Sequence, residues 1–540
     1  MRPVHSCRRF IGWMAWVIPV CGVSCDLSSS DPLPEDYLAA VTRSYEVSWN
    51  DLATGPGGEA LPVRALSAVE ASSKVQGSDT PLVLAQRMGA KALSLPRGLG
   101  CDLALSSIFP DPTNDPGDAR AYQWESLRDH LRETAARGMV PIWQTLYDIG
   151  EDSCAVDPAG PATATHRIGD SQTWSAVVGL LARWVNGALN PYYSDVAKAR
   201  LEALGLYPAY AEFLPDALRL GGYQNAGVSG VIGLYRPWFR AIHDAFLEET
   251  APRILARVAP SLPIASEAEI QDPTSPVGAF LELLATDATM APEVFGVLSR
   301  ARSPNAHATI LRDLRTALDQ KDLKSVRLAD MGMALDPDLW KDLAPLYPTR
   351  AQRSALFAAY GAMVRMQEQD LLTLLIPERW SGPKTSSTAI VGEDLFQEDD
   401  GRTLPAYAAL QVFARLDQGA GLRLRVLDVT EDTTTSTPSD SLRVLAARTS
   451  NGGVTLVVAA LPPLEEPRPA IRMRYDLTVK GLAQAPNGWV ITRWVVDSTT
   501  VGLKGPAEQS GITPVDGTVR VIREILGPAI HQIELAPKSP

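Results

Sequence analysis

The sequence has little cysteine and histidine. Its 540 residues include five cysteines and six histidines, and none of them falls into the spacing of a metal site. The sequence also lacks a P-loop, a dinucleotide-binding fingerprint, an H-E-x-x-H helix and a G-x-S-x-G elbow. These absences leave nucleotide-binding, metalloprotease and serine-hydrolase functions without support, and we expect no metal and no cofactor.

Runs of positive charge are absent as well. Lysine and arginine number 50 against 62 acidic residues, and the net charge is −12. Proteins that bind nucleic acid need clustered basic side chains to meet the phosphates, so we expect no nucleic-acid partner. The charge suits a neutral ligand better than an anionic one. A hydrophobic content of 45% is that of an ordinary globular protein, and the length suits one large domain with a smaller one.

The N-terminus has the pattern of an export signal. Three arginines precede an apolar stretch at residues 10–20, which is too short to span a bilayer stably. The next segment, Gly-Val-Ser-Cys at residues 22–25, resembles a bacterial lipobox, in which the cysteine is lipidated and becomes the mature N-terminus. Gly22 departs from that pattern, because leucine is usual there, so ordinary cleavage is the alternative.

We therefore expect residues 1–25 to be a lipoprotein signal peptide and residues 26–45 a tether. The protein would then be extracytoplasmic, in the periplasm or at the cell surface, and held to a membrane through a lipid on Cys25. Two further cysteines would remain in the mature chain, Cys101 and Cys154. They can pair in an oxidising compartment or stay as two buried thiols.

The middle of the chain alternates short apolar runs with amphipathic stretches of helical period, which is typical of a parallel sheet built from βα units. This pattern predicts an α/β fold with a (β/α)₈ TIM barrel over residues 46–416. We expect helices at residues 232–258, 306–320, 350–367 and 405–416. The expected strands are Leu61–Ser67, Ala90–Leu95 (or Asp102–Ile108), Met139–Leu146, Ala209–Leu214, Leu262–Ser266, Val294–Ser299, Ser325–Asp330 and Leu371–Ile376.

After residue 416 the helical pattern stops. Closely spaced runs of β-forming residues follow one another between Gly, Pro and Asn turns, which predicts a C-terminal antiparallel β-sandwich over residues 417–540. The expected strands are Leu422–Val429, Leu442–Thr449, Val454–Leu461, Ile471–Val479, Trp489–Asp497, Thr518–Ile525 and Ile530–Leu535.

Four motifs along the predicted barrel occur in the order known from one enzyme family. They are an FPD loop with Y-x-W and G-x-x-P-I at residues 109–143, Y-A-E-F-L-P-D at 210–216, V-R-L-A-D-M-G at 326–332 and G-R-T-L-P-A-Y-A-A-L at 401–410. They resemble the corresponding motifs of glycoside hydrolase family 39 and its relatives in clan A. No single motif is specific, but their order and spacing cover roughly residues 60 to 416. The resemblance implies a barrel with an appended sandwich, and a carbohydrate substrate.

The resemblance also implies where catalysis would occur. The family has two catalytic glutamates at the carboxyl ends of strands four and seven, an acid/base and a nucleophile about 5–5.5 Å apart in retaining enzymes. The matching positions here are Asp216 and Asp330, whose side chains are one methylene shorter. Pro215 replaces the asparagine before the acid/base, and the Arg-x-His of strand two and the histidine of strand six have no counterpart. We therefore expect weak or lost catalysis.

Each candidate also has a structural interpretation. Asp216 can cap the segment after it, and Glu212 can form a buried ion pair. Asp330 at a strand end is the better catalytic candidate, because a carboxylate in a barrel mouth is costly without a role or a partner. The residues expected to contact a sugar are Glu212, Gln144, Tyr147, Arg300, Glu378 and Trp380.

Two functions fit these observations. The first is a divergent O-glycosyl hydrolase, similar to β-glycosidases or β-xylosidases, with Asp216 as acid/base and Asp330 as nucleophile or water-activating base. The second is a non-catalytic lipoprotein that binds a polysaccharide or serves as a surface scaffold. An open cleft with the two carboxylates facing each other would favour the enzyme, whereas a filled mouth or diverging side chains would favour the scaffold.

Overall fold

A computed structural model describes most of the chain after residue 40. The described residues are 41–55, 57–64, 68–70, 81–94, 108–111, 113–144, 171–189, 199, 209–213, 228–247, 256–264, 266–377, 403–418, 421–430, 441–465, 470–500, 503 and 505–538. The expected leader, most of the tether and the pair Cys101 and Cys154 lie outside these residues. No helix within the described ranges is long and apolar enough to cross a membrane.

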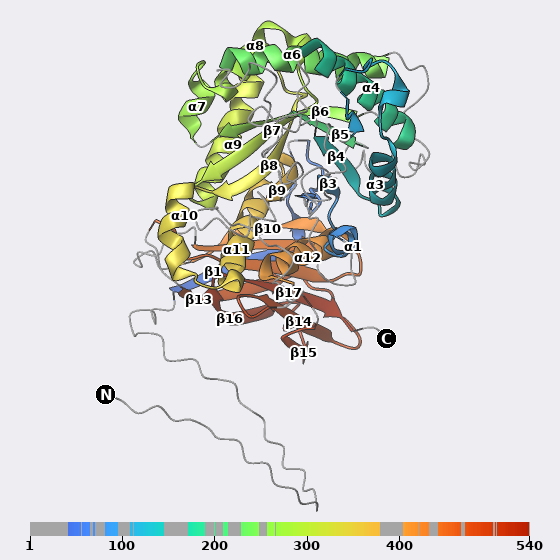
Figure 1. Ribbon diagram of the computed structural model, residues 1–540. Coiled ribbons are helices and arrows are strands. Elements are labelled where there is room, and N and C mark those ends of the chain that lie inside the picture. The colour runs from blue at the N-terminus through green and yellow to red at the C-terminus, as the bar shows by residue number, and fades with distance from the viewer. Residues whose placement is uncertain are drawn as a thin grey trace, which may run out of the picture. The chain divides into compact units, whose positions relative to one another are not determined.

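Eight strands form one parallel sheet in the order β2-β3-β4-β5-β6-β7-β8-β9 (Figure 1). The two end strands, β2 and β9, are in contact, as a (β/α)₈ barrel requires. The strand bounds are β2 Ala68–Glu70, β3 Ala92–Ser94, β4 Val140–Gln144, β5 Ala209–Phe213, β6 Ala256–Ile264, β7 Val294–Ala301, β8 Arg327–Leu335 and β9 Leu372–Pro377.

Helices connect these strands, and several begin at a residue whose side chain caps the first turn. At α8 and α9 a serine, Ser275 or Ser303, accepts a backbone N–H from the first turn, and proline follows at once. Thr349 and Gln352 form a capping box at α11. The helix bounds are α1 Pro81–Arg87, α3 Glu125–Ala136, α4 Ser171–Leu189, α6 Val228–Leu247, α7 Glu267–Gln271, α8 Pro276–Thr286, α9 Pro304–Gln320, α10 Pro337–Leu343, α11 Arg350–Glu368 and α12 Pro405–Gln418.

Two expected barrel elements are placed differently. The first barrel strand is β2 at residues 68–70, not the apolar run at 61–67; in that run Leu61 and Val63 bond to the backbone of residues 421–423 instead. The helix expected to continue to residue 258 ends at 247, and residues 256–258 begin β6. Both differences have one cause, because a short apolar run does not reveal which partner will cover it.

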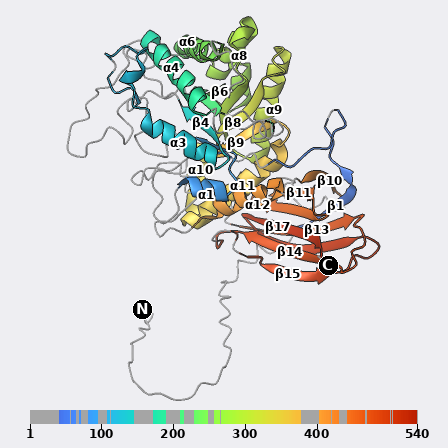
Figure 2. The ribbon, with the colours of Figure 1, turned by 90° about the vertical axis from the view of Figure 1, so that its right-hand side faces the viewer.

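The remaining strands form a nine-stranded sheet in the order β15-β14-β17-β12-β11-β10-β1-β13-β16. Figure 2 shows β14, β15 and β17 side by side at one edge. The opposite edge strand, β16, contacts β12 and β17, so the sheet folds back over an apolar interior. The bounds are β1 Val41–Leu52, β10 Leu422–Asp428, β11 Leu442–Arg448, β12 Val454–Ala460, β13 Ile471–Lys480, β14 Trp489–Val496, β15 Glu508–Ile512, β16 Val519–Gly527 and β17 Ala529–Pro537.

Strand β1 makes this sheet mixed instead of purely antiparallel. It pairs antiparallel with β10 and parallel with β13, so it lies inside the C-terminal sheet (Figure 1). Its side chains Tyr45 and Val47 are buried in the interior of that sheet. The expected division at residues 45 and 46 into tether and barrel is therefore wrong for residues 41–52, which belong to the C-terminal domain.

Strand β12 is buried on both faces. Its Val457 and Ala459 join the core of the barrel domain, whereas Leu456 and Val458 point into the C-terminal sheet's own interior. Helix α11 of the barrel contacts β11, β12 and β17. The two domains thus share an apolar interface. Successive side chains of β12 point to opposite faces of the sheet, as in every strand, so they enter the two cores in turn.

Candidate functional site at the ends of the barrel strands

The candidate residues come from the strand ends at which barrel enzymes carry their chemistry. Gln144 is the last residue of β4 and pairs with Glu212 of β5, so their backbones lie side by side. Arg300 is the next-to-last residue of β7, pairs with Ala334 and is half-buried. Trp143 is buried in the core. The other expected site residues, Asp216, Tyr147, Glu378, Trp380 and Cys25, lie outside the described part of the chain.

Asp330 does not lie at a strand end. It is the fourth residue of β8, which continues to Leu335, and its exposure is 0%. The hydroxyl of Ser299 donates a hydrogen bond to Oδ2, and the Ser299 backbone N–H lies 3.4 Å from Oδ1. Nε2 of His307 lies 2.6 Å from Oδ2. Two neighbouring elements, β7 and the first turns of α9, therefore hold the carboxylate.

Serine, histidine and aspartate in contact suggest a nucleophilic triad, but the geometry is different. The same ring nitrogen, Nε2 of His307, lies 2.5 Å from Ser299 Oγ and also contacts the aspartate. A triad needs the two ring nitrogens to separate the serine from the aspartate. Here Nδ1 has no hydrogen-bond partner among the described residues. The cluster therefore holds the Asp330 carboxylate in place and does not activate Ser299.

Helix α11 covers the other side of the cluster. Arg365 and Tyr360 of α11 are buried, and both interact electrostatically with Asp330. Burial lowers the pKa of Arg365 to about 10, although the negative charge of Asp330 opposes that shift. Burial, together with the charge of Asp330, raises the pKa of the Tyr360 hydroxyl. The guanidinium is thus near enough for the carboxylate's charge to act on it, although Nε and Nη2 of Arg365 have no hydrogen-bond partner among the described residues.

The carboxylate of Asp330 therefore faces the layer of helices and not an open mouth. This corrects the orientation that the motif match implied. The partners of the carboxylate give the reason, because Ser299 of β7 and His307 of α9 lie on its side of β8. In the β8–β9 ladder the extra residue of β8 lies between Asp330 and Met333, so it changes the face of later residues and not that of Asp330. A catalytic role for Asp330 stays a prediction.

The sequence interpretation missed His307, Ser299 and Arg365. A signal for His307 was present, because it lies four residues before Leu311 and seven before Leu314, on the helical face that those leucines bury. A histidine on such a face needs a polar partner. Among the described residues, no group of three acidic, histidine or cysteine side chains is placed to hold a metal ion.

Comparison with known proteins identifies the fold. No family model and no curated protein matches the sequence. A glucosidase from Croceicoccus marinus matches with a TM-score of 0.60 at 15% identity, over 92% of this chain and 100% of that one. The GH39 enzyme from Xanthomonas axonopodis pv. citri matches with 0.61 at 12%, over 93% and 99%. A monomeric β-xylosidase from Caulobacter crescentus CB15 matches with 0.58 at 13%, over 92% and 100%.

These likenesses define the class of fold. The chain has the fold of glycoside hydrolases, across the barrel and the C-terminal sheet together. In particular, it shares the fold of a family 39 enzyme, and the resemblance that the motifs suggested is confirmed at the level of fold. Identities of 12 to 15% leave the chemistry of the site to be judged from the residues themselves.

Proposed function

We propose that this protein binds a polysaccharide or oligosaccharide in the mouth of a glycosidase-type barrel, with weak or lost hydrolysis. The observation that supports this most is the burial of Asp330, the residue that the motif match aligns with the family's nucleophile. A nucleophile must touch the anomeric carbon of the substrate. A carboxylate at 0% exposure, bonded to Ser299 and His307, has no such access.

The ligand class rests on the fold and on the polar residues at the strand ends. The similar structures include a glucosidase and a β-xylosidase, which act on sugars. Gln144 and Glu212 on adjacent strands, with Arg300 of β7, would bond sugar hydroxyls. Tyr147, Glu378 and Trp380 would complete the subsite, and Asp216 would be the acid/base of any residual hydrolysis.

Binding to a glycan panel tests the proposal directly. We expect the purified protein to be retarded in affinity electrophoresis through gels containing xylan or a mixed-linkage β-glucan. Gln144→Ala combined with Arg300→Ala should weaken the retardation about ten-fold or more, because hydrogen bonds to a charged group contribute about 1.5–3 kcal/mol each. Gln509→Ala on the exposed face of β15 is the matched control. Unretarded migration of the wild type on every glycan would contradict the proposal and favour a purely structural surface protein.

The location of the protein in the cell is a second part of the proposal. A lipid on Cys25 would hold the barrel at the extracytoplasmic side of a membrane. We expect the wild type to sediment with membranes and Cys25→Ala to be released or to remain unprocessed, whereas Ser24→Ala should behave as the wild type. A soluble extracytoplasmic wild type whose N-terminus is a residue other than Cys25 would refute the anchor.

A further inference from the structure

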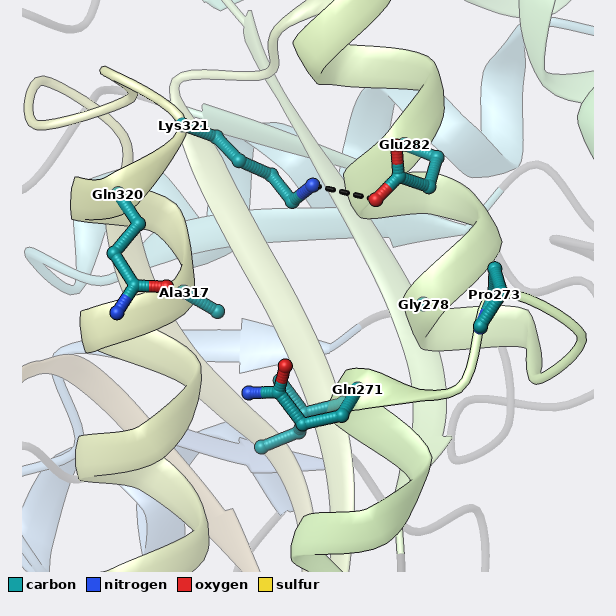
Figure 3. A pocket seen from close by; sticks show the side chains of 8 residues that line it. Gln271, Pro273, Gly278, Glu282, Ala317, Gln320 and Lys321 are labelled. Carbon is teal, nitrogen blue, oxygen red and sulfur yellow. Dashed lines mark hydrogen bonds and ion pairs between the residues drawn. The ribbon is translucent and has the colours of Figure 1, made fainter.

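A hollow lies on the outer surface of the barrel, away from the carboxyl ends of the strands. Its volume is about 290 Å³, and it lies between the α7–α8 segment and the last turn of α9 (Figure 3). Helix α9 leads into β8, so its last turn lies at the end of the barrel where strands begin. Barrel enzymes carry their chemistry at the opposite end. The hollow is therefore separate from the proposed mouth site.

The lining of the hollow is mainly polar, with a smaller apolar part. Ile270 and Ala317 are the buried apolar residues of this lining. Gln271 reaches from the end of α7 toward α9, and Gln320 projects from the last turn of α9 (Figure 3). Both glutamines are exposed, so their amides are open to a ligand. This lining is more polar than that of most small-molecule sites, which suits a ligand rich in hydroxyl groups.

An ion pair forms one wall of the hollow. Nζ of Lys321 donates to a carboxylate oxygen of Glu282 at 2.6 Å, which joins α9 to α8 (Figure 3). The two charges cancel, and the remaining lining residues are neutral. The wall therefore favours neither an anion nor a cation. It offers donors and acceptors in similar number, as the two amides also do.

The segment between α7 and α8 is held in shape. A Cβ on Gly278 would lie 2.0 Å from the carbonyl oxygen of Asp272, so only glycine permits this close approach. The Asp272 carboxylate accepts hydrogen bonds from the Thr274 N–H at 2.8 Å and from the Thr274 hydroxyl at 2.7 Å. Ser275 caps α8 by accepting the Gly278 N–H at 2.9 Å. A wall fixed in this way loses little entropy when a ligand binds.

We infer that this hollow is a second carbohydrate-binding site, which holds one neutral sugar residue of the same glycan that the mouth would bind. The inference rests on the proposed function for its ligand class. Sugar hydroxyls both donate and accept, and they match two amides and a neutralised ion pair. The volume lies at the lower end of the about 300–1,000 Å³ of small-molecule sites, which suits a single ring better than a long chain.

Hydrogen exchange with xylotetraose and cellotetraose tests the inference. Saturating oligosaccharide should protect backbone amides at residues 266–286 and 313–324. In Gln271→Ala/Gln320→Ala the half-saturating concentration for this protection should rise about ten-fold, the size expected for two lost neutral hydrogen bonds. Gln509→Ala is the control, and both changes to the hollow are at exposed positions, so folding should be unaffected.

The mouth variant separates the two proposals. Gln144→Ala/Arg300→Ala should leave protection of the hollow unchanged. Protection confined to the barrel mouth, or protection of residues 266–286 that the double glutamine variant does not weaken, would overturn the second site and leave the mouth proposal standing. Absence of protection anywhere with either oligosaccharide would overturn both.

Discussion

Purified wild-type protein is expected to release little or no nitrophenol from nitrophenyl β-xylosides and β-glucosides. Two features act in the same direction. The Asp330 carboxylate is buried against Ser299 and His307. Pro215 cannot donate the hydrogen bond that the family's asparagine makes to the sugar 2-hydroxyl and that strengthens in the transition state. The loss of a base that activates water alone costs about 10²–10⁴-fold in rate. Turnover should therefore fall at least that far below the level of an intact family enzyme.

The stereochemistry of any residual hydrolysis is a second readout of the same prediction. Because the buried Asp330 carboxylate does not reach the substrate, it cannot form the covalent intermediate of the retaining mechanism, and any residual hydrolysis would use a water directly. Residual activity should thus invert the anomeric centre, and proton NMR of the first product detects this.

Variants of Asp216 and Asp330 test whether either residue takes part in hydrolysis. Residual hydrolysis should fall to background in Asp216→Asn, whereas Asp330→Asn removes a carboxylate that does not reach the substrate and should leave it unchanged provided that the variant folds. Robust wild-type hydrolysis that neither change affects would remove both residues from the mechanism. Robust hydrolysis that both changes abolish would show that the site is intact, and that the buried state of Asp330 changes when substrate binds.

Replacing Asp330 by alanine should destabilise the barrel by about 3–5 kcal/mol, the usual cost of removing one partner from a buried charged pair. The change removes the carboxylate that both the Ser299 hydroxyl and His307 Nε2 contact, leaving these two groups only each other, and it removes the negative charge that acts on buried Arg365. Urea unfolding followed by tryptophan fluorescence measures the free energy. Asp330→Asn keeps an acceptor but loses the charge, so its effect should be smaller.

A surface aspartate provides the matched control. Asp338 begins α10 and pairs with Lys341 at 2.7 Å, and both side chains are largely exposed. Exposed pairs contribute little, so Asp338→Ala should unfold at nearly the same urea concentration as the wild type. If Asp330→Ala proved as stable as this control, then Asp330 would not be the buried partner described here, and the main support for lost catalysis would disappear.

Local sequence signals were sufficient to predict many of the helices and strands of the barrel. The turns that begin α8, α9 and α11 are set by a serine or threonine cap beside proline or glutamine, and these act within a few residues. Strands β3, β4, β5, β7 and β9 fall on the apolar runs that predicted them, within a few residues at each end. Order and spacing of the four motifs were enough to indicate the glycosidase fold.

Other features depended on contacts between distant parts of the chain. Tyr45 lies beside Asp428 and Leu477 in the sheet, and no local pattern in residues 41–52 specifies partners so far away. The orientation of Asp330 depended on its contacts with Ser299 of β7 and His307 of α9, which lie 31 and 23 positions away in the chain. The sequence alone determined where several of the barrel's helices and five of its strands form, because caps and periodicity are local. Only the tertiary structure decided which sheet β1 joins and which way Asp330 points, because strand pairing and burial are properties of the whole fold.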